Sequence, residues 1–382
     1  MMTDTATVRE AAGAVVDAEL ELPLSVAGMI GAVTVEGSTA FVTVAVPIAA
    51  WPKAHELVHE VADVVEALPG IDDVEVERRT MSEDERIALR STLRELMGEV
   101  PEHTGLHEHS HGDPTPRFLS TSAKTRVLGI SSGKGGVGKS SVTVNLAIAL
   151  AKAGKTVGVL DADVYGFSIP KMLGPDHDPI ILGDTVIPTA VHGVRCLSMG
   201  FFVPDEQPVI WRGPMLHKAI EQFVADAWWG EPDFLLIYMP PGTGDVALTL
   251  SEVLPRVEIY VVTTPQPAAQ RVAQRSAWAA RKMKLAVRGV IENMSWFTGD
   301  DGARYEIFGA GGGDELAGQL GVPMLGQIPL VAALREGGDE GDPITVSDPG
   351  SEASTSFDAI AAKVIAQGPA RVYRQELRLS GA

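Results

Sequence analysis

The stretch Gly133-Lys134-Gly135-Gly136-Val137-Gly138-Lys139-Ser140 fits the phosphate-loop pattern G-x-x-x-x-G-K-[ST] and decides the fold. Thr125–Ser131, before it, is predicted to be a buried strand, and Ser140–Ala153, after it, a helix that ends at Gly154. Glycines let the backbone wrap around phosphate oxygens, so that N–H groups and the positive helix end face the anion. This context predicts a site for a nucleotide rather than a glycine-rich turn without a ligand.

All eight residues of the loop are therefore predicted to bind the nucleotide. The Lys139 ammonium is expected to bridge the β- and γ-phosphates, and the Ser140 hydroxyl to ligate Mg²⁺. The pattern itself does not require Lys134, and its charge alone would indicate no more than an exposed loop lysine.

Two carboxylates lie at the end of the next predicted strand, Thr156–Asp161: Asp161 closes it and Asp163 follows two residues later. Carboxylates at a strand tip opposite a phosphate loop suit Mg²⁺–water ligation and the positioning of an attacking water. We predict that Asp163 positions the water and that Asp161 supports the metal. A pair of solvated loop aspartates is the alternative. From these motifs the predicted catalytic residues are Lys139 and Asp163.

Residues 125–367 alternate between predicted strands and helices. The predicted strands are Arg126–Ser131, Thr156–Asp161, Val194–Ser198, Phe234–Met239, Glu258–Thr263, Val287–Glu292 and Met324–Pro329. This alternation predicts an α/β fold, a P-loop NTPase whose mainly parallel sheet is covered by helices on both faces. Ligands of such sheets bind at the carboxyl ends of the strands, where the motifs described above lie.

Residues 1–97 are predicted to form a separate small α/β domain. Its predicted helices are Val8–Glu19, Pro52–Leu68 and Glu83–Met97, and its strands Gly31–Val35, Thr39–Val46 and Asp73–Arg78. Residues 98–124 are predicted to be a flexible linker, and 368–382 a C-terminal tail. Four linker histidines form either a solvated tether or a loose metal site: His103, His107, His109 and His111.

Composition limits the partners and the compartment. A net charge of −19 and a pI near 4.9 argue against a protein that coats nucleic acid or an anionic membrane. No apolar run approaches the ~20 residues of a membrane span, and no secretion signal is evident, so we expect a cytoplasmic protein. Cys196 is the only cysteine, which rules out a disulfide within the chain.

Lys134 and the stretch around it resemble the phosphate loop of the MinD, ParA and nitrogenase-iron-protein group. The segments MPPGTGD (239–245), VIENMS (290–295) and LGQIPL (325–330), in this order, resemble the Mrp family of iron–sulfur cluster carrier ATPases. Residues 1–97 resemble the small domain found in such ATPases and in iron–sulfur assembly proteins. The resemblance covers nearly the whole chain.

This resemblance implies an ATP-binding and ATP-hydrolysing homodimer. Lys134 would reach the nucleotide of the partner copy and so join Lys139 and Asp163 as a catalytic residue. Asn293 would meet the adenine base. For Asn293, an asparagine that only forms a turn is the alternative. The implied function is to bind iron–sulfur clusters and transfer them to apoproteins, or to assist their assembly.

The chain departs from the family at two places. Tyr238 stands where the family has an Asp that holds a Mg²⁺-bound water, so we expect slow hydrolysis. The family's C-x-x-C is also missing, because residues 298–306 contain no cysteine. Cys196 is predicted to be a small buried hydrophobe. No iron–sulfur ligand is therefore identified, and the alternative function is an ATP-dependent dimerisation switch that holds no cluster.

Overall fold

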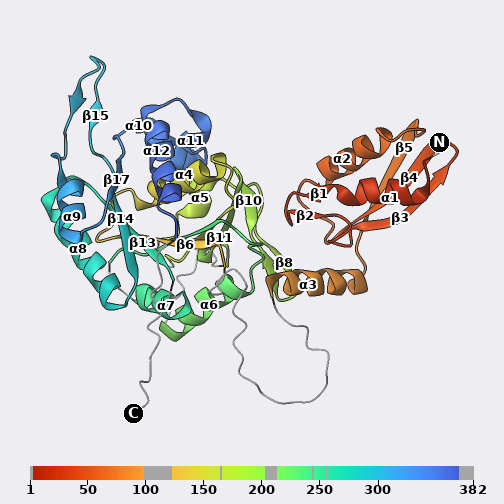
Figure 1. Cartoon of the computed structure of the whole chain (residues 1–382), viewed down its shortest axis with the longest axis horizontal. Coiled ribbons are helices and arrows are strands. Elements are labelled where there is room, and N and C mark those ends of the chain that lie inside the picture. Colours follow the sequence, from red (N-terminus) through yellow and green to blue (C-terminus); the bar gives the residue numbers. More distant parts are fainter. Residues whose placement is uncertain are drawn as a thin grey trace, which may run out of the picture. The chain divides into compact units, whose positions relative to one another are not determined.

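The computed structural model describes residues 3–98, 123–163, 166–202, 213–242, 245–254 and 256–369 (Figure 1). These residues form two compact units. The first unit contains residues up to 123 together with 177–190 and 222–231, and the second contains the rest. Most of the predicted linker, with its four histidines, and most of the predicted C-terminal tail lie outside the described residues.

The second unit is built on an eight-stranded sheet of order β10-β11-β7-β12-β6-β13-β14-β17. The strands are β6 (Arg126–Ser132), β7 (Val157–Asp161), β10 (Thr189–Val191), β11 (Val194–Ser198), β12 (Phe234–Tyr238), β13 (Glu258–Thr263), β14 (Ala286–Glu292) and β17 (Met324–Gln327). From β11 to β17 every neighbouring pair is parallel. Strands buried on both faces read as continuous apolar runs, which is why the sequence predicted seven of them.

Helices cover both faces of this sheet, as predicted; Figure 1 shows α4 and α12 on one side and α7 and α8 on the other. The helices are α4 (Lys139–Lys152), α5 (Ile169–Leu173), α6 (Gly213–Ala225), α7 (Asp245–Val253), α8 (Pro267–Lys282), α9 (Gly312–Leu320), α10 (Ala332–Glu340), α11 (Ile344–Ser347) and α12 (Glu352–Ala366). No helix in the described part of the chain has the length and apolar character needed to cross a membrane.

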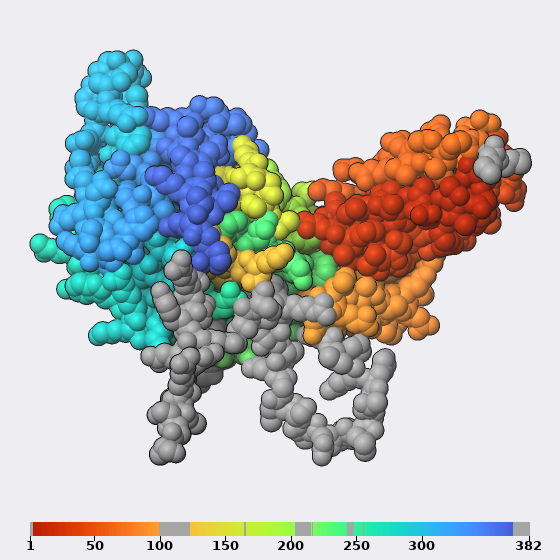
Figure 2. Space-filling view, viewed as in Figure 1, coloured from red at the N-terminus to blue at the C-terminus, as the bar shows by residue number. Residues whose placement is uncertain are grey.

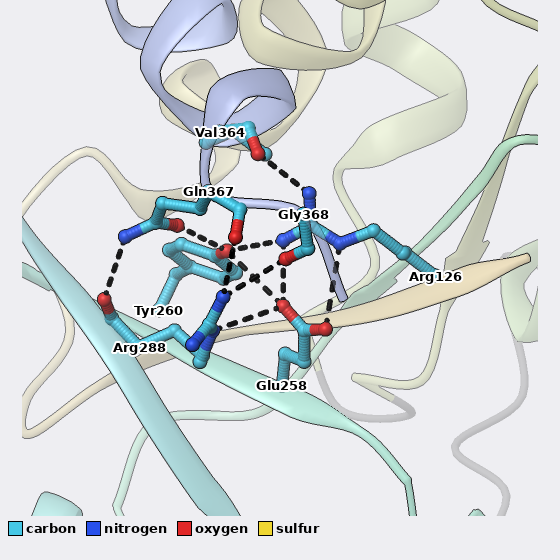
Figure 3. Close-up of polar contacts among 7 residues, drawn as sticks. All are labelled: Arg126, Glu258, Tyr260, Arg288, Val364, Gln367 and Gly368. Atoms are coloured by element: carbon cyan, nitrogen blue, oxygen red, sulfur yellow. Dashed lines mark hydrogen bonds and ion pairs between the residues drawn. The ribbon is translucent and has the colours of Figure 1, made fainter. Parts of the chain in front are cut away.

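A buried charge network ties the amino ends of the central strands to the end of α12 (Figure 3). Arg126 of β6 and Glu258 of β13 form an ion pair with 2.6 Å between Nη2 and Oε2, and their side chains are 6% and 3% exposed. Arg288 of β14 donates to the Gly368 carbonyl at 2.9 Å. Arg126 also donates to the Val364 carbonyl at 2.5 Å. This network lies at the opposite end of the sheet from the phosphate loop.

Replacing Glu258 by Ala is expected to destabilise the second unit by about 3–5 kcal/mol, because it leaves the buried Arg126 guanidinium without its counter-charge. Denaturant unfolding, followed by circular dichroism, measures the change. The matched control is Glu336→Ala, since Glu336 pairs with Arg335 in a bridge whose side chains are 67% and 56% exposed. Loss of that exposed pair should change stability by no more than about 0.5 kcal/mol. Equal effects of the two substitutions would contradict a structural role for the network.

The first unit contains a three-stranded sheet of order β3-β4-β5. Its elements are α1 (Thr5–Ala14), β1 (Val16–Asp17), β2 (Leu22–Pro23), β3 (Ile30–Glu36), β4 (Thr39–Val46), α2 (Ala54–Glu66), β5 (Asp73–Thr80) and α3 (Glu83–Met97). The strands β3 and β4 are antiparallel, whereas β4 and β5 are parallel. Ser82 caps α3 reciprocally with Glu85, which explains where that helix begins.

The predicted helix Val8–Glu19 is wrong beyond Ala14. Asp17 is 2% exposed, and its carboxylate accepts hydrogen bonds from the backbone of Leu20 at 2.8 Å and from the Trp51 indole at 2.9 Å. A short aspartate side chain that bonds nearby backbone N–H groups stabilises a turn in place of a helix. The chain therefore leaves α1 and pairs β1 with β2.

The predicted domain boundaries need one amendment. Residues 177–190 and 222–231 fall within the predicted domain 125–367 but belong to the first unit. They include β8 (Ile180–Leu182) and β9 (Thr185–Ile187). Leu182, Ile187 and Trp228 join the apolar core of that unit, and the Trp228 indole donates to the Leu20 carbonyl at 2.9 Å. Burial of these apolar side chains explains why the two segments pack with the first unit, although the residues around them in sequence belong to the second.

Candidate nucleotide-binding site

The phosphate loop joins β6 to α4, as the sequence predicted. Gly138 has a φ of 74°, in the left-handed region that favours glycine. A Cβ atom on Gly133 would lie 2.2 Å from the backbone carbon of Val272 in α8, and one on Gly138 would lie 2.1 Å from the Asn293 amide nitrogen. The Gly133 contact is with backbone, so that position requires glycine for space, whereas Gly138 requires glycine for its positive φ and a side chain there would displace the Asn293 amide.

Lys139 begins α4, and its side chain is buried. Its Nζ donates a hydrogen bond to the Met239 carbonyl and lies 3.1 Å from the centroid of the Tyr238 ring. Burial lowers the pKa of Lys139 to about 7, although Asp163 and Asp161 act in the opposite direction. A phosphate anion close to this amine would favour its charged form.

The Ser140 hydroxyl lies between two other hydroxyl groups. It donates to the Tyr238 hydroxyl at 2.8 Å and accepts from the Ser168 hydroxyl at 2.8 Å. Tyr238 is paired in register with Asp161 across β12 and β7. Burial is the main cause that raises the Tyr238 pKa. Ser168 precedes the short helix α5, and no local motif marks it as a site residue.

Asp161, the last residue of β7, and Asp163 are both buried, so the alternative of solvated loop residues is wrong. Asp161 accepts hydrogen bonds from the backbone nitrogens of Asp163 at 3.0 Å and of Ser168 and Ile169 at 3.2 Å each. Burial raises the Asp161 pKa to about 7, against the effect of these bonds. Asp161 therefore orders the segment that follows β7.

Oxygen ligands of the kind that Mg²⁺ takes gather beside the loop. Ser168 connects them, because its backbone meets the Asp161 carboxylate and its side chain meets the Ser140 hydroxyl. Asp161 already accepts three backbone hydrogen bonds, whereas Asp163 is 6% exposed and perturbs Lys139 electrostatically. These carboxylate and hydroxyl oxygens fit a magnesium ion. Asp163 and Ser140 are the groups that could hold it, and Asp161 would support them.

Asn293 lies against the phosphate loop. It follows β14, is 2% exposed, and its Nδ2 donates to the Val137 carbonyl at 3.0 Å. Its backbone nitrogen donates to the Thr263 carbonyl at 2.8 Å. Among the described residues, its buried Oδ1 has no hydrogen-bond partner. Asn293 therefore holds the loop through its amide nitrogen. Its contact with adenine remains a prediction.

Asn293→Ala is expected to weaken ATP binding about 3- to 10-fold, the value of one lost hydrogen bond to the loop. Titration of the variant with ATP and with GTP separates its two proposed contacts. Equal losses for both nucleotides would indicate support of the loop alone, whereas a larger loss for ATP would indicate that the amide also reads adenine. An unchanged affinity for both would contradict either role.

Glu292, which the sequence did not single out, fixes the end of the strand that carries Asn293. It is fully buried and accepts hydrogen bonds from the Ser295 hydroxyl and the Gln327 amide at 2.8 Å each. It also accepts one from the backbone of Gly313, in the first turn of α9, at 2.5 Å. A carboxylate at a helix N-terminus satisfies donors that the helix leaves unpaired. Glu292 thereby anchors the glycine-rich segment that precedes α9.

The Lys134 side chain contacts a residue of its own chain in this structure. Its Nζ donates to the Gln266 amide oxygen, just before α8, at a long 3.5 Å, and its side chain is half-buried. The Ser132 hydroxyl donates to the Lys134 carbonyl at 3.1 Å. A hydrogen bond of this length holds the amine only weakly, so Lys134 can turn to another acceptor.

No iron–sulfur ligand set is found in the described ranges, where no three His, Cys, Asp or Glu residues gather to hold a metal. Cys196 is fully buried in β11, and burial raises its pKa well above the usual value. The interval that lacks the C-x-x-C forms a hairpin of β15 (Phe297–Thr298) and β16 (Arg304–Tyr305), a narrow projection in Figure 2. Asp301 there accepts a hydrogen bond from the Tyr305 hydroxyl at 2.7 Å and so stabilises the turn.

Comparison with known proteins agrees with this geometry. A family model described as "NUBPL iron-transfer P-loop NTPase" matches residues 123–365, and one described as "Iron-sulfur cluster assembly protein" matches residues 5–78. The chain is 43% identical over 347 residues to the iron-sulfur cluster carrier protein of Mycobacterium leprae, covering 89% of this chain and 87% of that protein. It is 39% identical over 355 residues to the iron-sulfur cluster carrier protein of Synechocystis, covering 91% and 93%.

Solved structures resemble a part of the chain. A nucleotide-binding protein from Archaeoglobus fulgidus, in complex with ADP, superimposes with a TM-score of 0.52 at 33% identity, over 61% of this chain and 93% of that one. The cell division ATPase MinD of Pyrococcus furiosus superimposes with a TM-score of 0.50 at 25% identity, over 63% and 99%. These comparisons confirm the resemblances stated from the motifs.

Proposed function

Because the chain belongs to the family of NUBPL-type iron-transfer P-loop NTPases, whose relatives at 39–43% identity are iron-sulfur cluster carrier proteins, we propose that it is an ATPase of iron–sulfur cluster transfer or assembly. The observation that carries the proposal is the loop between β6 and α4, with buried Lys139 at its end. The proposed location is the cytoplasm, in keeping with a single cysteine that is a buried free thiol.

The geometry of the loop and its neighbours supports the following proposed roles. The eight residues 133–140 hold the phosphates of ATP through their backbone N–H groups, and Lys139 supplies positive charge to the β- and γ-phosphates. Mg²⁺, when bound, neutralises phosphate charge, and Ser140 and Asp163 are the residues that would hold it. Asp163 also orients the attacking water. Hydrolysis is slow, because the phenol of Tyr238 replaces a carboxylate beside Ser140.

The proposed assembly is a homodimer with ATP between its two copies. Lys134 would leave Gln266, to which it is bound at 3.5 Å, and contact the nucleotide of the partner copy. Lys134→Ala should therefore abolish dimerisation by ATP while nucleotide binding to each copy persists. Light scattering with and without a non-hydrolysable ATP analogue tests this. Proteins of iron–sulfur assembly and apo-client proteins are the proposed partners.

A second function is favoured by the burial of Cys196 and by the ligand-free hairpin. The chain would then be an ATP-dependent dimerisation switch that passes a signal to a partner and carries no cluster itself. Two thiolates from two copies would in any case be fewer than the four that a [4Fe–4S] cluster takes.

Metal and sulfide analysis of anaerobically purified protein, followed by reconstitution with iron and sulfide, separates the two functions. Bound iron and sulfide in equal amounts, with cluster absorbance, would support a carrier whose ligands differ from the family's. A colourless protein that still dimerises with ATP would support the switch. Absence of any adenine nucleotide affinity would refute both.

A further inference from the structure

The Tyr238 side chain contacts the two side chains that end the phosphate loop, the Lys139 amine and the Ser140 hydroxyl. The Tyr238 ring centroid lies 3.1 Å from Lys139 Nζ, and the Tyr238 hydroxyl accepts a hydrogen bond from Ser140 at 2.8 Å. Tyr238 is 6% exposed and ends β12, which lies between β6 and β7. A substitution at this residue therefore acts on the nucleotide site directly.

The hydroxyl groups beside the loop form a directed chain. Ser168 donates to Ser140, and Ser140 donates to Tyr238, at 2.8 Å in each case. A hydroxyl group has one proton to donate. The protons of both serines are thus used within the chain. Tyr238 accepts at its end, and Ser168 is a second hydrogen-bonding neighbour of the phenol. A hydroxyl proton rotates about its C–O bond, so the phenol proton can turn to a phosphate oxygen as acceptor.

At position 238 a phenol would attract a polyphosphate, whereas a carboxylate would repel it. A carboxylate is an anion that accepts hydrogen bonds only, so it repels a phosphate unless a cation lies between them. A phenol is neutral at pH 7, since its reference pKa is about 10, and it can donate to a phosphate oxygen directly. Hydrogen bonds to charged acceptors are also the stronger kind.

We infer that Tyr238 is a specificity-determining residue that lets this site bind the nucleotide as its free polyphosphate anion, without a divalent cation. The inference rests on the proposed nucleotide-binding function. The Tyr238 hydroxyl donates to a phosphate oxygen, and Lys139, beside the same ring, supplies the opposite charge. Mg²⁺ then serves hydrolysis more than affinity.

Calorimetric titration of the full chain with AMPPNP, once in excess Mg²⁺ and once in EDTA, tests the inference. The wild type is expected to bind with dissociation constants that agree within about threefold in the two buffers. Tyr238→Phe keeps the ring against Lys139 and removes only the hydroxyl, so its affinity in EDTA should fall about tenfold. Tyr238→Asp should bind in Mg²⁺ and lose most of its affinity in EDTA.

Two results would overturn the inference and leave the proposed function intact. One is wild-type binding that is about tenfold or more weaker in EDTA than in Mg²⁺. The other is Tyr238→Phe binding in EDTA as tightly as the wild type, which would assign the phenol a packing role only. Failure to bind in either buffer would overturn the proposed function as well. The Phe variant preserves the buried ring, so the test does not depend on whether the Asp variant folds.

Discussion

Lys139→Ala is expected to lower ATP affinity by about 3 kcal/mol or more, roughly 100-fold in Kd. The amine is buried beside Met239 and Tyr238, so nothing at the surface can replace its charge. Folding should not suffer, because burial lowers the Lys139 pKa to about 7 and the folded protein gains little from this charge. Calorimetric titration with ATP, with circular dichroism to verify the fold, measures the effect.

Lys282→Ala is the matched control, since Lys282 lies exposed on α8. Its ATP affinity should equal that of the wild type within about twofold. Retention of wild-type affinity by Lys139→Ala would remove the basis for assigning the loop to a nucleotide.

Tyr238→Asp is expected to raise the Mg²⁺-dependent turnover of ATP roughly tenfold or more. The new carboxylate would stand in register with Asp161 and beside the Ser140 hydroxyl, where it can accept from a metal-bound water. Release of phosphate at saturating ATP and Mg²⁺ measures the rate.

Tyr238→Phe supplies the comparison, because it removes the hydroxyl without adding an acceptor for a metal-bound water. Its turnover should not rise above that of the wild type. Equal rates for the wild type and the Asp variant would show that Tyr238 does not limit hydrolysis.

The large sheet could be predicted because parallel strands buried on both faces leave uninterrupted apolar runs, such as Phe234–Tyr238. The phosphate loop could be predicted because its chemistry depends on residues adjacent in sequence. The end of the first helix could not be predicted, since the segment after it is held by Asp17, whose carboxylate accepts from the indole of Trp51, 34 positions away. Helical periodicity contains no information about such a contact.

In the site too, contacts between residues distant in sequence could not be predicted. The replacement at Tyr238 was visible as a departure from a motif, but its contact with Ser140 joins residues 98 positions apart. Ser168 and Glu292 act through contacts to backbone and side chains that only the fold brings near. Sequence therefore located the chemical groups, while their mutual orientation required the structure.

Because residues 177–190 and 222–231 pack into the first unit, the boundary in space is not a boundary along the polypeptide. A fragment that starts at residue 124 would retain the whole phosphate loop yet present Leu182, Ile187 and Trp228 to water without the core that covers them. Biochemistry on this protein is best done with the intact polypeptide.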